Sequence, residues 1–296
     1  MREPRIQTTV ALPMLPPLPG WIGSGPAETL EAAAFRSGAA LAHLALVTAA
    51  DDLPLALWRD RLALAAAEVC VGYSGRREGQ GALRDAAHLT KAGDNPGPAG
   101  KVLRQWSHAV ARPISGAGLA KTIEGVAAVQ IALCLDTAGA TPVDRAAQVL
   151  GSVLSDSRRA ETAALILADA VLSKVLGQHH ILPLLSLALK PRDLRLRGDD
   201  LRLACHRAVV DGVRQAVPLA ADLARGAVRL QAVLPKLRAK GAAQAVDLFL
   251  SRDALAPSAL VAFMSDRAAR RLCDRLVDLG ALRELSGRDT FRLYGV

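Results

Sequence analysis

Aromatic residues are scarce in this sequence: they make up 3% of the 296 residues, although 51% of all residues are hydrophobic. The apolar content comes mainly from Ala, Leu and Val, and Ala and Leu are strong helix formers. The β-branched and aromatic residues that favour strands are comparatively few. We therefore expect a mainly α fold, a helical bundle or array with a small β element at its end.

Cysteine is also rare, with four residues that lie far apart and form no CxxC pair. A zinc site needs clustered ligands, and a secreted disulfide scaffold is shorter and richer in cysteine. We expect no metal, no cofactor, and thiols that suit a reducing cytoplasm. These residues are Cys70, Cys134, Cys205 and Cys273.

A long uninterrupted apolar run is missing where it would be most expected. The most apolar region, residues 162–189, contains Asp169, Lys174 and Pro183, whereas a membrane-spanning helix needs about 20 consecutive apolar residues. Residues 1–7 are charged and prolines follow them, so the apolar segment of a signal peptide is not present. We expect a cytoplasmic protein without a membrane partner.

The motifs of common enzyme classes are missing too. The turn-rich segment before Lys101 lacks the GxxxxGK[ST] pattern of a phosphate-binding loop, because Val102 follows the lysine. His179 and His180 are adjacent, and adjacent side chains point apart on a helix or strand, so they do not form a metal pair by themselves. Carboxylates and histidines could still meet in the core of a bundle, but no spacing singles them out. An enzyme is therefore the least favoured class of function.

The chain divides into three predicted parts. Residues 1–26 hold many prolines and glycines and form an extended arm. Residues 27–240 form a helical domain, and residues 241–296 form a terminal domain of their own.

Hydrophobic periodicity places several helices in the middle part. The first runs from Glu28 towards Ala50, and later segments predict one helix over residues 201–217 and another over 219–237. The expected core positions of the first helix are Leu30, Ala34, Leu41, Leu44 and Leu46.

The positive charge is concentrated in one segment. The whole chain carries a net charge of +9, and residues 190–240 contain 12 basic against 5 acidic residues, a difference of +7. Residues 241–296 contain 8 basic against 7 acidic residues. A basic block beside the terminal domain is consistent with phosphate contact, and the alternative is an arginine-rich surface that only faces water.

The terminal domain has the outline of a winged helix. Its helices are expected over residues 242–250, 257–263 and 266–279, and Ser265 and Gly280 suit the start and the end of the third. Two short strands then flank the turn at residues 286–289. At about 100° per residue, the third helix has one apolar face and one arginine face. The arginine face consists of Arg267, Arg270, Arg271 and Arg275.

Three stretches of this domain resemble the winged-helix tails of some Fic-type adenylyl-transfer proteins. They are Ser265-Asp-Arg-Ala-Ala-Arg-Arg-Leu-Cys-Asp-Arg-Leu276, Leu279-Gly-Ala-Leu-Arg-Glu-Leu-Ser-Gly-Arg288 and Phe291-Arg-Leu-Tyr-Gly295. Fic chemistry needs an HxFxxGNGRxxR loop, and none of the six histidines begins one. Adenylyl transfer is therefore excluded for this chain.

Other stretches resemble an uncharacterised bacterial helical family, the domain-of-unknown-function family 1403. They are Arg61-Leu-Ala-Leu64, Gly75-Arg-Arg-Glu78, Ala82-Leu-Arg-Asp-Ala86 and Gly97-Pro-Ala-Gly100. This resemblance covers nearly the whole chain and implies no activity.

The first functional hypothesis is binding of double-stranded DNA, as a transcription or mobile-element accessory factor. The arginine face would meet the major groove or its phosphates, and Arg288 at the hairpin tip would meet the backbone or the minor groove. Asp274 and Asp278 argue against it, because they have helix pair spacing with Arg270 and Arg275 and can neutralise them.

The alternative is that the winged helix is a docking surface for a second copy or for another protein. Mixed charges suit that role equally well. DNA binding is placed ahead because the adjoining segment supplies the charge of +7.

Overall fold

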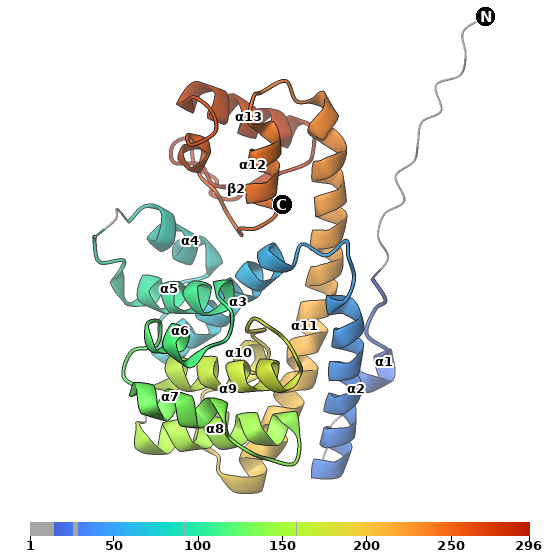
Figure 1. Cartoon of the computed structure of the whole chain (residues 1–296), viewed down its shortest axis with the longest axis vertical. Coiled ribbons are helices and arrows are strands. Elements are labelled where there is room, and N and C mark those ends of the chain that lie inside the picture. Colours follow the sequence, from blue (N-terminus) through green and yellow to red (C-terminus); the bar gives the residue numbers. More distant parts are fainter. Residues whose placement is uncertain (1–14, 26–28, 91–92, 158) are drawn as a thin grey trace, which may run out of the picture.

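A computed structural model describes residues 15–25, 29–90, 93–157 and 159–296, and it confirms a mainly α fold (Figure 1). These residues contain thirteen α-helices, three short 3-10 helices and one two-stranded sheet. Most of the predicted arm lies outside the described residues. Its last described part includes α1 (Gly20–Gly23), which places Ile22 in the core.

The longest helix, α11 (Gly198–Val233), extends along the whole molecule (Figure 1). α2 (Leu30–Thr48) packs along one side of it, and two further helix pairs complete the body. The first pair is α8 (Pro142–Asp156) with α9 (Glu161–Val175), and the second is α3 (Leu55–Tyr73) with α5 (Gly97–Ala111). The smaller elements of the body are α4 (Gln80–His88), α6 (Gly116–Ala120), α7 (Ala128–Leu135), α10 (Leu185–Ala188), η1 (Asp193–Arg195) and η2 (Leu234–Lys236).

The prediction of two helices over residues 201–237 is wrong, because α11 continues through Pro218. Proline removes one backbone hydrogen bond from a helix interior. Pro218 and Arg214, the residue whose carbonyl loses its donor, are both exposed, so water can replace that bond. Val217 and Ala220 on either side are buried, and this packing holds the helix together.

The core joins all the helix pairs and includes Trp58, Trp106 and Phe249 as its largest buried side chains. Within α2, Leu41 and Leu44 are buried as expected. The expectation for Leu46 is wrong: its side chain is 66% exposed because it lies on the side of α2 that faces away from α11.

One carboxylate is buried in the core. Asp169 on α9 is completely buried and accepts hydrogen bonds from the backbone N–H groups of Leu184, Leu185 and Ser186 and from the Ser186 hydroxyl. These are the unpaired donors at the start of α10. The carboxylate therefore fixes this short helix between α9 and α11.

The last part of the chain, residues 241–296, is named the C-terminal unit here. It contains α12 (Ala242–Phe249), η3 (Pro257–Leu260), α13 (Asp266–Asp278), β1 (Arg283–Glu284) and β2 (Tyr294–Gly295). Two antiparallel strands form as predicted, with Glu284 opposite Tyr294, but each has two residues, and residues 285–293 connect them in place of the predicted turn at 286–289. Leu255 forms a bridge to Tyr294 from the other side, so β2 lies between Leu255 and β1. The second helix is only the short η3, because Val261 and Phe263 are exposed and give a longer helix no face to bury.

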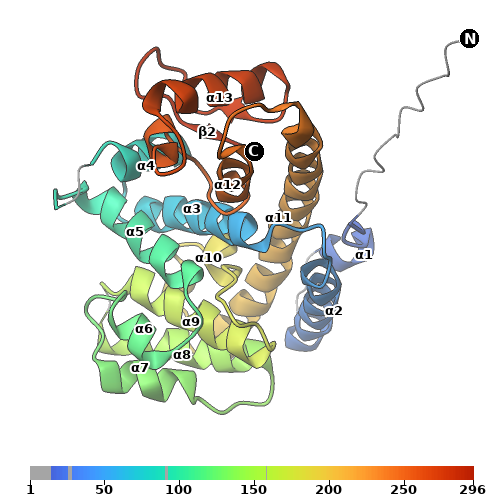
Figure 2. The same ribbon diagram turned by 45° about the horizontal axis from the view of Figure 1, so that its top comes forward.

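The C-terminal unit is seated on the body rather than joined by a linker alone. Figure 2 shows α12 and β2 above α3, with α4 on one side and the end of α11 on the other. Val296 packs against Gly226 of α11 so closely that a Cβ atom at Gly226 would lie 2.2 Å from its Cγ1 atom. Only glycine allows this approach.

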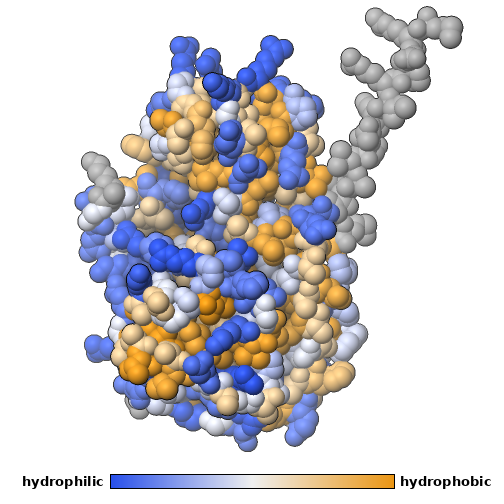
Figure 3. All heavy atoms as spheres, viewed as in Figure 1, coloured by the Kyte–Doolittle hydropathy of each residue, from blue (hydrophilic) through white to orange (hydrophobic). Residues whose placement is uncertain are grey.

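Exposed apolar side chains gather on α7 and on α1 with α2. On α7, Val129 and Leu133 are 69% and 68% exposed. Figure 3 shows an orange area at the lower left, where Figure 1 places α7. On α1 and α2, Trp21, Phe35 and Leu46 are more than half exposed. Over the described ranges, α2 is the one helix that is long and apolar enough to cross a membrane by length and composition, and a third of that window is buried against the body.

Candidate functional site

The arginine face belongs to α13, whose ends follow the sequence signals. The Ser265 hydroxyl accepts a hydrogen bond from the Ala268 N–H group at 3.4 Å, and Gly280 ends the helix with a φ of 67°. Left-handed φ values of this kind favour glycine. The apolar face is buried against the unit, and its buried residues are Ala269, Leu272, Cys273 and Leu276.

Three of the four helical arginines form an open stripe on α13. Arg267, Arg271 and Arg275 follow one another at intervals of four residues, which places them along one side of a helix. All three are exposed. None has a hydrogen-bond or ion-pair partner among the residues that the structure describes. Their guanidinium groups are available to an external anion.

Asp266 and Asp274 of α13 line the side that faces the hairpin, whereas Asp278 lies on the same side of the helix as the stripe, seven residues after Arg271. Arg270 pairs with Asp266 at 3.1 Å, and Asp274 accepts a hydrogen bond from the Tyr294 hydroxyl at 3.3 Å. The expected pairs of Arg270 with Asp274 and of Arg275 with Asp278 are not formed in this structure. The stripe is therefore less neutralised than its sequence indicates.

A groove separates α13 from the hairpin loop. It has a volume of about 620 Å³ and is lined by Asp266, Arg270 and Asp274 from the helix and by Phe291 and Arg292 from the loop. The groove carries both signs of charge. Phe291 is 74% exposed and has a φ of 55°, which is uncommon for a residue with a side chain.

Arg288 at the hairpin loop lies apart from the other four arginines. Its guanidinium forms two hydrogen bonds to the Asp85 carboxylate on α4, with Nη1–Oδ2 and Nη2–Oδ1 distances of 3.0 and 2.6 Å. Both side chains are about one-third exposed. The structure therefore shows Arg288 joining the hairpin to the body, in contact with protein rather than open to solvent.

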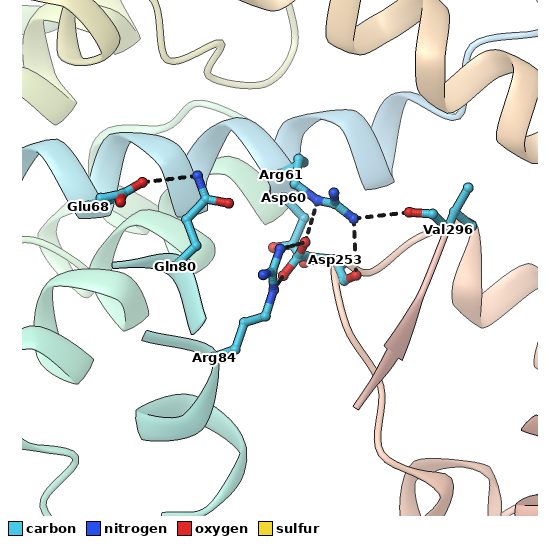
Figure 4. A network of polar contacts seen from close by, with 7 residues as sticks. All are labelled: Asp60, Arg61, Glu68, Gln80, Arg84, Asp253 and Val296. Carbon is cyan, nitrogen blue, oxygen red and sulfur yellow. Dashed lines mark hydrogen bonds and ion pairs between the residues drawn. The ribbon is translucent and has the colours of Figure 1, made fainter. Parts of the chain in front are cut away.

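Beneath the C-terminal unit lies a network of charged side chains centred on Asp253 (Figure 4). Arg84 of α4 donates two hydrogen bonds to the Asp253 carboxylate, with Nε–Oδ2 and Nη2–Oδ1 distances of 2.7 and 2.9 Å. Arg61 of α3 pairs with the same carboxylate and reaches the Val296 carbonyl oxygen at 3.4 Å. Asp60 accepts the Asp253 backbone N–H at 2.9 Å.

Burial changes the pKa values of two side chains in this network, Asp60 and Arg61. Burial raises the pKa of Asp60, although the hydrogen bond from Asp253 opposes the shift. Burial lowers the pKa of the Arg61 guanidinium, while the charge of Asp253 raises it. A cavity of about 320 Å³ lies beside the network, and Asp60, Arg84, His88 and Asp253 contribute to its lining. The charges of two carboxylates and two guanidinium groups compensate one another. The network therefore suits a structural contact between the C-terminal unit and the body better than catalysis.

Sequence reasoning did not find this network. Arg61, Arg84 and Asp85 lie within the stretches that resemble family 1403. That resemblance is the feature of the sequence that could have pointed to these residues. Their partners Asp253 and Arg288 are more than 160 residues further along the chain, so no local spacing connects them.

A buried Ser-His-Asp arrangement joins α2, α11 and α8. The Ser37 hydroxyl lies 2.7 Å from His206 Nδ1, and His206 Nε2 lies 3.9 Å from Asp144 Oδ1. The Ser37 hydroxyl donates to the Ala34 carbonyl at 3.0 Å, so the network assigns the Nδ1 proton to the histidine and makes Ser37 the acceptor. The three residues are at most 4% exposed. The arrangement therefore lacks both an activated nucleophile and access for a substrate.

Metal binding finds no support in the geometry either. No three His, Cys, Asp or Glu side chains of the described part of the chain are grouped as ligands would be. The cysteines are all buried and free.

The comparisons with known proteins concern the whole chain. The family model described as "Protein of unknown function (DUF1403)" matches residues 7–296. No curated protein matches the sequence. The stretches singled out above, including the Arg61 and Arg84 segments of the network, all lie within the matched range. Because the match leaves out only the first six residues, this protein belongs to the DUF1403 family of proteins of unknown function.

Proposed function

We propose that this protein binds double-stranded DNA through a winged-helix unit formed by residues 241–296, with α13 as the helix that contacts the duplex. The observation that carries this proposal is the stripe of Arg267, Arg271 and Arg275. Three exposed guanidinium groups without an acidic partner in the described ranges lie along one side of one helix. Arginine donates to phosphate oxygens and to guanine edges.

The order of elements in the C-terminal unit supports the winged-helix interpretation. A helix, a bridging residue, a helical turn, a second helix and a hairpin follow one another, and β2 lies between Leu255 and β1. α13 is the helix before the hairpin, which is the one that a winged helix presents to DNA. Arg270 is paired with Asp266 and contributes less to the proposed contact. Arg288 stays in the proposal only as the residue that fixes the hairpin.

The test measures binding of the full chain to a random-sequence duplex by fluorescence anisotropy across a salt series. We expect the double variant Arg271→Gln/Arg275→Gln to bind at least tenfold more weakly at about 100 mM salt. Each phosphate contact contributes about −0.9 to the slope of log K against log salt, so the loss of two contacts reduces the slope by about 1.8.

The matched control removes the same amount of charge elsewhere. Lys121 and Arg159 are exposed; Lys121 directly follows α6 and Arg159 lies between α8 and α9, helices that Figure 1 shows apart from α13. The variant Lys121→Gln/Arg159→Gln should keep the affinity and slope of the wild type. Equal losses in both variants would mean that only net charge matters, and no binding at low salt would overturn the proposal.

The alternative function, docking of a second copy or of another protein on this unit, is favoured by one observation. Phe291 projects beside the groove of mixed charge, and large exposed aromatic residues are enriched at protein interfaces. If the unit fails to bind DNA, this groove becomes the first surface to substitute.

A further inference from the structure

α5 carries exposed basic residues along one side of the helix. They recur at intervals of three, four and four residues, fall within roughly 80° around the helix and extend over about 16 Å of its axis. The buried residues of α5, such as Trp106 and Val110, lie on the opposite side, so the basic side faces outward. Its members are Lys101, Arg104, His108 and Arg112.

This side of α5 is not neutralised from within the chain. Residues 95–123 contain four Lys or Arg residues and no Asp or Glu; the nearest acids in sequence are Asp94 and Glu124, in loops on either side. Among the described residues, none forms an ion pair or a side-chain hydrogen bond with Lys101, Arg104 or Arg112. Figure 3 shows blue, hydrophilic residues across the left and middle of the molecule, where Figure 1 places α5.

Arg252 of the C-terminal unit extends this basic side. It lines the cavity of about 320 Å³ together with Leu103 and Ser107 of α5, which places the loop after α12 beside α5. Burial lowers the pKa of His108, and the positive charges of Arg112, Arg104 and Arg252 lower it further. Three guanidinium groups therefore act on one imidazole. These five residues together are named the α5 basic face.

The like charges of this face repel one another. The charge of Arg252 also acts on the buried Asp60 and opposes the rise in the pKa of that carboxyl, so part of it is used within the protein. Lys101, Arg104 and Arg112 have no such use in the described part of the chain. An exposed basic patch of this kind attracts a polyanion.

We propose that the α5 basic face binds the phosphate backbone of double-stranded DNA as a second contact surface beside α13. The choice of a duplex as the partner rests on the proposed function, but the residues are different ones. Contacts of Lys and Arg with phosphates fix the position and orientation of a protein on the duplex without reading its sequence. Arg252 joins this face to the unit that carries α13.

The composition of the face favours a duplex over other polyanions. The large hydrophobic residues exposed in the described ranges all lie outside α5. Proteins that bind single strands stack the bases on aromatic side chains, and helices that bind membranes insert Trp, Phe or Leu beside their basic residues. Contact with the backbone of a duplex needs cations alone.

The test uses the double variant Arg104→Gln/Arg112→Gln of the full chain and a random-sequence duplex of about 40 base pairs. Fluorescence anisotropy across a salt series should show binding about fivefold weaker than the wild type at about 100 mM salt. The slope of log K against log salt should fall by about 1.8, because each phosphate contact contributes about −0.9. The loss should be the same for duplexes of different sequence, since phosphates carry no sequence information.

Two controls separate a local contact from charge and from folding. Arg104→Lys/Arg112→Lys keeps both charges and should bind within about twofold of the wild type, because lysine also pairs with phosphate. Lys121→Gln/Arg159→Gln removes the same amount of charge elsewhere and should bind as the wild type does. Circular dichroism should show every variant folded, since the substituted side chains are exposed.

Comparison with Arg271→Gln/Arg275→Gln separates this proposal from the proposed function. If one duplex contacts both surfaces, the variant with all four substitutions should lose about 3.6 from the slope. A loss confined to the α13 variant would overturn the α5 contact and leave the proposed function in place. A loss confined to the α5 variant would support the α5 contact and overturn α13 as the binding helix.

Three further outcomes would overturn the proposal. An equal loss in Lys121→Gln/Arg159→Gln would reduce the effect to net charge. A wild type that binds no duplex at low salt would exclude both DNA contacts. Flotation of such a protein with phosphatidylserine vesicles, abolished in Arg104→Gln/Arg112→Gln, would assign the face to a lipid surface.

Discussion

At the scale of single residues, the buried Asp169 makes the stability of the fold depend on pH. Burial raises the pKa of this carboxyl from 3.8 to about 6, although the hydrogen bonds from Ser186, Leu185 and Leu184 oppose the shift. An acid whose pKa is higher in the folded state binds protons more tightly there than in the unfolded chain. Its contribution to stability is therefore fully present below about pH 4 and is lost as the pH rises through about 6.

This sign gives a testable result for Asp169→Asn, which cannot titrate. The free energy of unfolding, measured with urea, should be lower in the variant at every pH, because the amide NH₂ cannot accept the Ser186 hydrogen bonds. The gap between wild type and variant should shrink by roughly 3 kcal/mol between pH 4 and pH 7, since each pKa unit corresponds to about 1.4 kcal/mol. A gap that widens over this range would mean that the hydrogen bonds outweigh burial.

Single residues also show why some predictions from the sequence were right and others were wrong. Ser265 and Gly280 act within one turn of their own helix, so the ends of α13 could be predicted closely. Leu46 was expected in the core because it is apolar, but an apolar residue on the exposed side of a helix looks the same in a sequence as a buried one. Pro218 was expected to separate two helices, and packing of its neighbours outweighs its local preference.

At the scale of elements, Asp253 holds the loop after α12 on α3 and α4. Its carboxylate is shared by Arg61 and Arg84, and the three side chains are at most 15% exposed. Replacing Asp253 by Asn would leave two buried guanidinium groups without their counter-charge. Breaking a buried pair in this way costs about 3–5 kcal/mol.

We therefore expect Asp253→Asn to lose several kcal/mol of unfolding free energy in urea titrations. The comparison is Asp199→Asn, which breaks the i,i+3 pair with Arg202 at a side chain that is 81% exposed. Such surface pairs contribute about 0–1 kcal/mol. Similar losses in both variants would show that the network does not hold the C-terminal unit on the body.

The network also shows why the joint between elements could not be derived from the sequence. The helical body and the hairpin were predicted from periodicity and turn residues, which are local signals. The contacts of Asp85 with Arg288 and of Arg84 with Asp253 connect residues about 200 and 170 positions apart, and mixed charges gave no indication of which would pair. For the same reason Arg288 was assigned to DNA, whereas the fold places it against α4.

At the scale of the whole molecule, positive charge alone draws the protein towards any polyanion. The chain carries a net charge of +9, and such a charge favours association with nucleic acid without any specific contact. A contact through α13 differs from this background because it depends on one helix, on Arg267, Arg271 and Arg275.

We expect the wild type to bind a duplex of about 10 base pairs, because one helical turn offers room for one α13. The double variant Arg271→Gln/Arg275→Gln should lose affinity on this short duplex as much as on one of about 40 base pairs, since the proposed contact is local to one helix. Anisotropy titrations of both proteins with both duplexes measure this difference. A loss on the long duplex alone would show that binding reports the net charge of the whole chain rather than a contact through α13.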